Sequence, residues 1–242
     1  MSGKVVLVAG ASSGTGRATA LYLAEKGYRV SICARRKNLI DEIVRKINSE
    51  GGIAYSETVD ITSWNEVERF FDNTVKKFGR LDVVVNNVGA GIRYTKFENL
   101  TINEIDDGIR INLISVLYGC KAAIPVMKKQ REGYIINVSS ILGKRSRSGL
   151  AVYTAGKHAV EGFSRALWNE VKEYGIKVSI IAPAMINTEW AKKAGIEKPF
   201  TSGKMIEPED IAHIIEFLIT LPKYYNVWNV DLMALSQTID PL

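Results

Sequence analysis

The stretch KVVLVAGASSGTG at residues 4–16 decides how the chain begins to fold. Its first part, residues 4–10, is almost wholly apolar and too short for a helix, which favours a buried strand. The glycines that follow allow a tight turn. Apolar residues at helical spacing then occupy residues 14–27, and Gly27 is a typical helix end. The stretch predicts a strand, a glycine-rich turn and a helix in succession.

The same alternation continues along the whole chain. Further strands are expected at 28–34, 53–60, 81–87, 133–140, 176–183 and 226–235, and helices at 38–50, 64–78, 101–129, 151–174 and from Pro208 onward. The strands are apolar throughout, which indicates burial on both faces. Alternation with helices favours right-handed crossovers and a parallel sheet. We therefore predict a doubly wound, three-layer α/β fold, with residues 1–242 in a single domain because no linker or internal repeat divides them.

Two of these helices carry recognisable end signals. Ser63 is expected to cap helix 64–78, and Gly79 to end it. Thr101 and Glu104 form a capping-box pattern at the start of the long helix 101–129.

Composition excludes several classes of protein. With 46% hydrophobic and 24% charged residues, the chain has an ordinary globular composition. It lacks the run of about 18 apolar residues that a membrane-spanning helix needs. The apolar N-terminal run leads directly into the glycine turn, so we interpret it as a strand and not as a signal peptide. Cys33 and Cys120 fall in an expected strand and helix, which favours core positions and fits a cytoplasmic location.

The net charge of +6 comes from lysines and arginines that are scattered along the sequence. The densest basic clusters, RRK at 35–37 and KRSR at 144–147, are short. A solvated surface is the usual interpretation of such clusters, and binding of an anionic small molecule is the alternative. We expect neither a nucleic-acid partner nor a membrane partner, and no metal site.

In a doubly wound sheet, ligands bind outside the carboxyl ends of the strands. The loop GASSGTG at 10–16 follows the first strand and opens a helix, as a phosphate-binding loop must. Glycine lets the backbone approach a pyrophosphate, and the helix N-terminus points free amides at the anion. A tight turn without a ligand is the alternative. The expected phosphate contacts are Gly10, Ser12, Ser13, Gly14, Thr15 and Gly16.

Arg35 and Arg36 follow the second strand, where a dinucleotide fold that prefers NAD often carries a carboxylate. A carboxylate would repel a 2′-phosphate, whereas a guanidinium can hold one with two hydrogen bonds. The two arginines therefore predict NADP (NADPH) as the cofactor, with Arg35 as the first contact. An exposed basic turn is the alternative.

Other strand ends complete the expected cofactor site. Asp60 would accept from the adenine amino group beside Ile61, although an aspartate that heads a turn is an equal alternative. In NNVG at 86–89, Gly89 would allow close approach to the ribose, although paired asparagines are common in turns. After strand 176–183, Thr188 would bond the nicotinamide carboxamide. The expected contacts from these loops are Asp60, Ile61, Asn87, Gly89, Pro183, Ile186 and Thr188.

Together these motifs resemble the short-chain dehydrogenase/reductase family. The resemblance covers about residues 4–235 and rests on GASSGTG, NNVG, Asn112, Ser140 and YTAGK at 153–157. It implies a Rossmann fold and an NADP(H)-dependent oxidoreductase that interconverts a carbonyl and a secondary alcohol by hydride transfer. A non-catalytic NADP-binding regulator, and an epimerase or dehydratase on the same fold, are the alternatives.

The resemblance also implies roles for four residues. Tyr153 would be the general acid/base, and Lys157 would bond the nicotinamide ribose and lower the pKa of Tyr153. Ser140 would hold the substrate oxygen, and Asn112 would anchor a water in a relay to Lys157. A phenol has a pKa of about 10, and a nearby ammonium favours its phenolate. Residues four apart face the same way on a helix, but tyrosine and lysine at this spacing also occur often by chance.

Three positions depart from the family pattern. Thr15 replaces the commoner isoleucine, Val88 the commoner alanine and Ala184 the commoner glycine. The changes keep a cofactor site in the prediction and alter its detailed fit.

The substrate side is expected under a lid at about 188–207, which contains Trp190 and Phe200. Tyr94 could add an apolar wall, and Trp190 could instead serve as an anchor that packs the lid shut. The expected contacts of the small-molecule substrate are Ser140, Leu142, Tyr153, Met185 and Trp190. The resemblance further implies a homodimer or homotetramer through helices 101–129 and 151–174. Apolar residues on these helices, namely Leu113, Leu117, Phe163 and Leu167, could equally belong to the monomer core.

Overall fold

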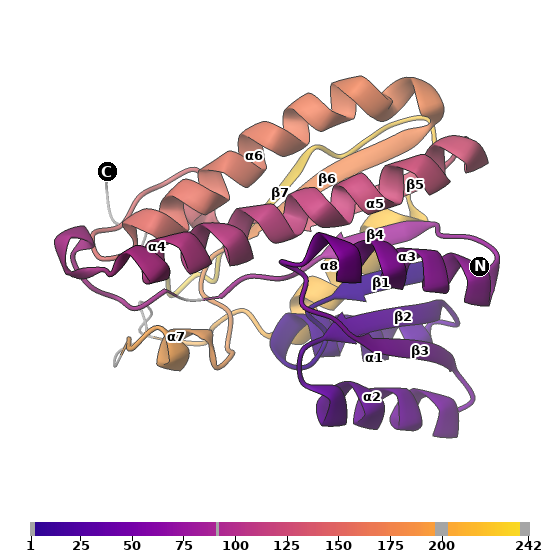
Figure 1. Ribbon diagram of the computed structural model, residues 1–242, viewed down its shortest axis with the longest axis horizontal. Helices are drawn as coiled ribbons and strands as arrows, with labels where there is room; N and C mark the ends of the chain where they lie inside the picture. The colour runs from indigo at the N-terminus through magenta and orange to yellow at the C-terminus, as the bar shows by residue number, and fades with distance from the viewer. Residues whose placement is uncertain (1–2, 91, 197–202, 238–242) are drawn as a thin grey trace.

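A computed structural model describes residues 3–90, 92–196 and 203–237 and contains the expected alternation (Figure 1). The strands are β1 Val5–Ala9, β2 Arg29–Ala34, β3 Ile53–Thr58, β4 Val83–Asn86, β5 Gly133–Val138, β6 Ile176–Pro183 and β7 Asn229–Leu232. The helices are α1 Gly14–Glu25, α2 Lys37–Ser49, α3 Trp64–Phe78, α4 Ile102–Ile109, α5 Ser115–Gln130, α6 Ala151–Val171, α7 Trp190–Lys193 and α8 Pro208–Thr220. Short 3₁₀ turns are Phe97–Asn99, Ile141–Gly143 and Lys172–Tyr174.

The seven strands form one sheet in the order β3-β2-β1-β4-β5-β6-β7. Every neighbouring pair is parallel. The chain begins at β1, moves outward to β3, and then returns to β4 to fill the other half. Strand order therefore reverses between β1 and β4, and the loops that follow these two strands diverge from each other. The predicted doubly wound parallel fold is confirmed.

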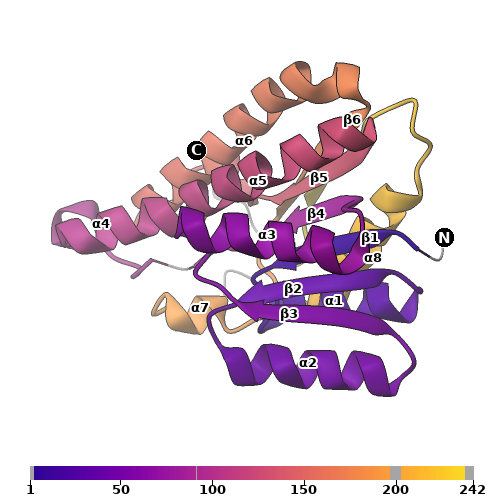
Figure 2. The same cartoon turned by 45° about the vertical axis from the view of Figure 1, so that its right-hand side comes forward.

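Helices cover both faces of this sheet (Figure 2). One core cluster joins α1, α2 and α8 to the sheet, and a second joins α3, α5 and α6 to the opposite face. Within β1, Val6 and Val8 belong to the first cluster, and Val5 and Leu7 to the second. Both sets of side chains are excluded from water, which explains why the strand is apolar throughout instead of alternating.

The expected single helix over 101–129 is interrupted. A π-helical turn, Arg110–Ile114, joins α4 to α5. Asn112 lies in this wide turn, and its Nδ2 donates to the carbonyl of Gly108 at 3.0 Å. The expectation of one regular helix is wrong. The spacing of apolar residues along the sequence does not reveal a single wide turn within a helix. The capping box of Thr101 and Glu104 is confirmed.

Element ends differ from expectation in smaller ways. Ser63 is the N-cap residue of α3, as expected, and its carbonyl accepts from Val67 N at 3.0 Å, but its side chain makes no capping bond to the described residues. Gly79 ends α3 in the left-handed region, with φ 78°, as expected. Helix α6 ends at Val171 and continues as a 3₁₀ turn, and β7 is shorter than the strand expected at 226–235.

Among the described helices, the one from Ile102 to Gln130 is long and apolar enough to cross a membrane by length and composition. Core helices of globular proteins meet the same criterion. Here the residues from Val116 to Met127 that face inward pack into the core cluster with the sheet. These contacts match a helix of the protein core.

Two helical glycines should respond in opposite directions to alanine. The added Cβ of Gly119→Ala would lie 2.1 Å from Asn86 Oδ1, whose side chain bonds Asn137 Oδ1 at 2.8 Å. We expect a loss of about 1–3 kcal/mol in the free energy of unfolding. Gly162→Ala meets nothing within 4 Å, so it should gain about 0.5–1 kcal/mol from helix propensity. Urea unfolding followed by circular dichroism measures both, and a neutral Gly119→Ala would contradict the tight contact.

Candidate active site

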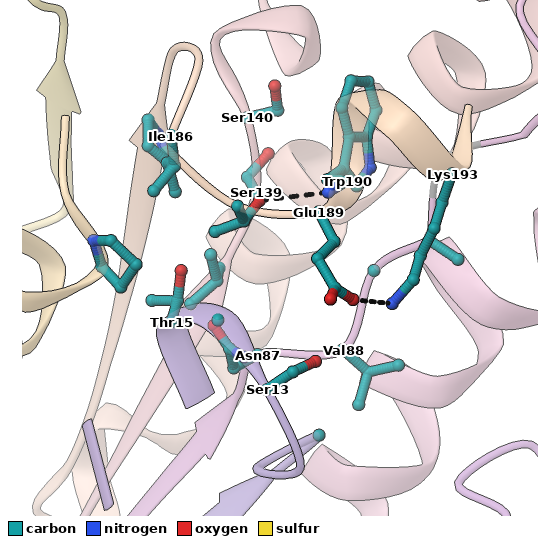
Figure 3. Close-up of a pocket in the computed structure, with 18 of the residues that line it drawn as sticks. Ser13, Thr15, Asn87, Val88, Ser139, Ser140, Ile186, Glu189, Trp190 and Lys193 are labelled. Atoms are coloured by element: carbon teal, nitrogen blue, oxygen red, sulfur yellow. Dashed lines mark hydrogen bonds and ion pairs between the residues drawn. The ribbon is translucent and has the colours of Figure 1, made fainter. Parts of the chain in front are cut away.

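A cleft of about 1030 Å³ opens at the carboxyl ends of the strands, and Figure 3 shows part of its lining. Nearly all residues expected from the sequence line it. They are Gly10, Ser12, Ser13, Gly14, Thr15, Arg35, Arg36, Asp60, Ile61, Asn87, Gly89, Ser140, Leu142, Tyr153, Lys157, Pro183, Met185, Ile186, Thr188 and Trp190. Gly16, Asn112 and Tyr94 are not in the lining. Phe200 lies outside the described residues.

The glycine loop leaves no room for a side chain at its three glycine positions. Gly10 and Gly14 have φ of +77° and +53°, a region that L residues rarely adopt. A Cβ on Gly16 would lie 2.4 Å from Gly10 O, so only glycine lets the start of α1 approach the loop. A Cβ on Gly10 would lie 2.9 Å from Val88 Cγ2, which shows that Val88 packs directly on the loop. The cradle thus exposes backbone at its glycines, beside the hydroxyls of Ser12, Ser13 and Thr15.

The two arginines after β2 point to different partners. Arg36 Nη2 donates to Ser12 Oγ at 2.9 Å and to Ser13 Oγ at 2.7 Å. Arg35 lies close enough to Asp60 for its charge to act on that carboxyl. Arg36 is therefore joined to the glycine loop, and Arg35 as the first contact of a 2′-phosphate stays a prediction.

Asp60 heads a turn, as its alternative interpretation held. Its Oδ1 accepts from Thr62 N at 2.9 Å and from Thr62 Oγ1 at 2.8 Å. Burial raises the pKa of this carboxyl, but the bonds from Thr62 and the charge of Arg35 outweigh burial and hold the pKa below its usual value. The carboxylate also lines the cleft, so the two interpretations are compatible.

Ser140, Tyr153 and Lys157 meet where β5 ends and α6 begins. The Ser140 hydroxyl accepts from Leu142 N at 3.2 Å. Its hydrogen bond with the Tyr153 phenol acts to lower the pKa of that phenol. Lys157 Nζ donates to Val138 O at 3.0 Å and lies 5.7 Å from the centre of the Tyr153 ring. The side chains of Tyr153 and Lys157 are buried, at 7% and 2% exposure. Both ionisable groups therefore sit in a largely dry corner of the cleft.

Burial shifts these two groups in opposite senses. It raises the pKa of Tyr153 to about 12, although the Ser140 hydroxyl partly opposes the shift. It lowers the pKa of Lys157 to about 8. Each shift favours the neutral form, as expected in surroundings of low polarity. In the protein by itself, burial sets the net direction of the Tyr153 pKa shift, and a lowering of this pKa by Lys157 stays a prediction.

Asn112 reaches this corner from the π-helical turn. Its Nδ2 donates to Gly108 O at 3.0 Å and to Ala90 O at 3.1 Å. Its Oδ1 is buried and has no hydrogen-bond partner among the described residues. Oδ1 lies 3.4 Å and Lys157 Nζ 3.1 Å from the point where Gly89 would carry a Cβ. The amide oxygen and the ammonium thus face the same small space beside Gly89.

Trp190 closes the substrate side of the cleft. Its ring centre lies 5.2 Å from that of Tyr153, with the rings tilted by 58°, and it packs in a small apolar cluster with Leu142 and Leu150. Tyr94 N donates to Ala194 O at 2.7 Å, which ties the end of α7 to a neighbouring loop. Trp190 therefore both anchors this segment and forms a wall of the cleft.

Several lining residues were not foreseen. Arg145, Arg147 and Leu150 come from the turn after β5, and Met233 and Gln237 from the C-terminal segment. The sequence does show the basic KRSR cluster shortly after Ser140, and this position could have indicated that Arg145 and Arg147 line the cleft. No local pattern identifies Gln237. Its Nε2 donates to Met185 O at 2.7 Å, in a distant part of the sequence.

Comparisons with known proteins agree on the family. The family model described as short chain dehydrogenase matches residues 4–198. An uncharacterized oxidoreductase of Staphylococcus aureus is 33% identical over 94% of this chain and 95% of its own length. A 3-oxoacyl-[acyl-carrier-protein] reductase of Synechocystis sp. is 34% identical over 92% of this chain and 91% of its own. The alcohol dehydrogenase of the archaeon Thermococcus sibiricus, solved with 5-hydroxy-NADP, has a TM-score of 0.90 and 27% identity over 98% of this chain and 99% of that chain.

The buried Lys157 should make stability depend on pH. Its pKa is about 8 in the folded chain and about 10.5 when unfolded, so the unfolded chain binds more protons between these values. The free energy of unfolding should rise with pH across this window, by up to about 1.4 kcal/mol per pH unit relative to Lys157→Met. Lys129→Met, at an exposed site, is the control. Urea unfolding at several pH values tests this, and parallel curves for wild type and Lys157→Met would contradict it.

Proposed function

Because the chain belongs to the short-chain dehydrogenase family, we propose that this oxidoreductase is NADP(H)-dependent and interconverts a carbonyl and a secondary alcohol. The observation that carries the proposal is the convergence of Ser140, Tyr153 and Lys157 at one end of a cleft whose other end is a bare glycine cradle. The reductase and alcohol dehydrogenase names of two similar proteins support the same reaction class.

The residues present fit a dinucleotide. Positive φ at Gly10 and Gly14, and the close contact between Gly16 and Gly10 O, give a tight backbone turn that leads into the N-terminus of α1, where backbone amides favour an anion. Thr188 lies beside Gly14, with its Cγ2 3.2 Å from the Cβ position there, so both loops can contact one elongated ligand. Asp60 and Ile61 would contact the adenine, and Asn87, Gly89, Pro183 and Ile186 the remaining parts. When bound, the nicotinamide would supply or accept the hydride.

Arg36 is the strongest candidate for contact with a 2′-phosphate. Its guanidinium is already oriented by Ser12 and Ser13, so little side-chain entropy would be lost on binding. Arg35 would add a second cation from the side of Asp60. The NADP analogue bound to the similar Thermococcus enzyme supports this preference.

Arg36→Ala should therefore weaken NADPH binding selectively. Loss of a charge-assisted contact predicts about a 10- to 100-fold higher dissociation constant for NADPH, with NADH changed less than about twofold. Arg35→Ala should show a smaller loss of the same kind. Fluorescence titration measures both cofactors, with Arg45→Ala on exposed α2 as the control. Equal losses for NADPH and NADH would remove the 2′-phosphate role.

During reduction, Tyr153 would donate its phenolic proton to the oxygen that gains negative charge. Ser140 would donate a second hydrogen bond to the same oxygen. The high pKa of Tyr153, about 12 in the protein by itself, suits an acid that holds its proton until that charge develops. Lys157 would stabilise the resulting phenolate and hold the ribose. A water between Lys157 and Asn112 Oδ1 would return the proton, since that oxygen is a buried acceptor.

Tyr153→Phe should abolish turnover and spare cofactor binding. Loss of the acid predicts a fall in kcat of about 10²- to 10⁴-fold, with the NADPH dissociation constant nearly unchanged. NADPH oxidation with a panel of ketones, aldehydes and keto acids measures this, with Tyr225→Phe, half-exposed and outside the cleft, as the control. Unaltered activity in Tyr153→Phe would contradict the mechanism. NADPH binding without oxidation by the wild type would favour the regulator, and substrate conversion without net NADPH oxidation an epimerase or dehydratase.

The substrate and assembly belong to the same proposal. Leu142, Met185 and Trp190 would contact a small carbonyl compound held at Ser140 and Tyr153. A homodimer or homotetramer would use the outer faces of α4, α5 and α6. Leu113 and Phe163 are only partly buried there, whereas Leu167 belongs to the core.

A further inference from the structure

Glu161 is a buried carboxyl that the proposed mechanism does not use. It lies one helical turn after Lys157 on α6, and only 3% of it is exposed. Residues four apart share a helix face, so Glu161 extends the buried face that begins with Tyr153 and Lys157. A carboxyl is rarely buried without a partner or a task.

The turn that carries Ser140 rests on this carboxyl. The 3₁₀ turn Ile141–Gly143 packs against α6, and Gly143 marks the contact. A Cβ on Gly143 would lie 2.6 Å from Ser139 Oγ, 2.9 Å from Glu161 Cγ and 3.0 Å from Lys157 O. Ser139 and Glu161 therefore face each other across a position that has no side chain.

The two carboxylate oxygens of Glu161 lie in different surroundings. Oε2 accepts from Arg165 Nη2 at 3.1 Å, near the surface. Oε1 is buried and accepts no hydrogen bond from the described residues. The nearby Ser139 hydroxyl makes only a long bond, 3.4 Å to Lys157 O. A hydroxyl rotates freely, so its proton can turn from this weak acceptor to the carboxylate.

Charged groups from three directions act on Glu161. Burial raises its pKa, while Lys144, Ser139 and Arg165 lower it and Asp231 on β7 raises it again. Lys144 also pairs with Asp231. The net result is a pKa above the usual value, so protonation of Glu161 begins at a higher pH than for an exposed glutamate.

We infer that Glu161 is a positioning residue for the reaction: its carboxylate accepts from the Ser139 hydroxyl and so fixes the turn that aims Ser140 at the substrate oxygen. The inference rests on the proposed function. It links the reacting end of the cleft to Arg165, Lys144 and Asp231, which do not line the cleft.

Kinetics of Glu161→Met, Glu161→Gln and Ser139→Ala test this inference. Met keeps the volume but removes the acceptor, so kcat should fall about tenfold with the KM for NADPH unchanged. Gln keeps an acceptor oxygen and should restore part of kcat.

Activity of the wild type should decline on acidification as Glu161 is protonated, and Glu161→Gln should lack this decline. Glu161→Met combined with Ser139→Ala should be no slower than Ser139→Ala. Glu170→Met, exposed on the same helix, is the control.

Two results would overturn the inference while leaving the proposed function intact. One is an unchanged kcat in Glu161→Met. The other is a double variant whose loss of kcat equals the product of the losses in the two single variants. Urea unfolding of the wild type, Glu161→Met, Ser139→Ala and the double variant gives a second measurement that does not depend on turnover. The effects of the two substitutions on the free energy of unfolding should be non-additive, whereas additive effects would show that the two side chains do not interact.

Discussion

The burial of the Lys157 ammonium is the constraint on which the reacting end of the cleft depends. A charged amine removed from water needs an acceptor, and the carbonyl of Val138 at the end of β5 provides it at 3.0 Å. This bond fixes α6 against the end of β5. Tyr153, one turn earlier on the helix, and Ser140, two residues beyond the strand, are then brought together. A second polar link, from Asn137 Nδ2 on β5 to Ser164 Oγ on α6 at 2.8 Å, lies deeper in the core, so the bond of Lys157 is the one that acts at the cleft end of the helix.

The opposite end of the cleft is governed by the absence of side chains. Gly10 and Gly16 let the backbone of the first turn approach the start of α1, and Val88 fills the remaining space above Gly10. Val88 was a departure from the family pattern that put the fit in question. It packs on the loop at Gly10 and also lines the cleft, so its effect on the fit of a cofactor stays a prediction. The cleft therefore combines a cradle of backbone groups with a dry corner of ionisable side chains.

The sequence predicts the fold well because its main signal is burial. Strands such as Val5–Ala9 are apolar on both faces, and only a sheet covered on both sides satisfies them. Nearly all residues that it singles out also line the cleft, since most of them follow strands. What it misses depends on contacts distant in sequence. Nothing near Arg36 indicates that it bonds Ser12, and nothing near Gln237 indicates that it reaches Met185. The direction of the Tyr153 pKa shift likewise depends on burial by Trp190 and its neighbours.

The π-helical turn at Arg110–Ile114 has a consequence for how this chain can vary. One extra residue in a helical turn rotates everything after it by about 100° relative to a regular helix. Here the rotation turns Asn112 inward and sets which face of α5 meets the sheet. Single-residue substitutions around it are a local matter. A deletion between Gly108 and Ser115 would restore a regular helix, and the entire face from Val116 to Met127 would leave the core. The number of residues in this segment therefore governs the packing of α5 as a whole, whereas the side chain of Asn112 matters to the cleft.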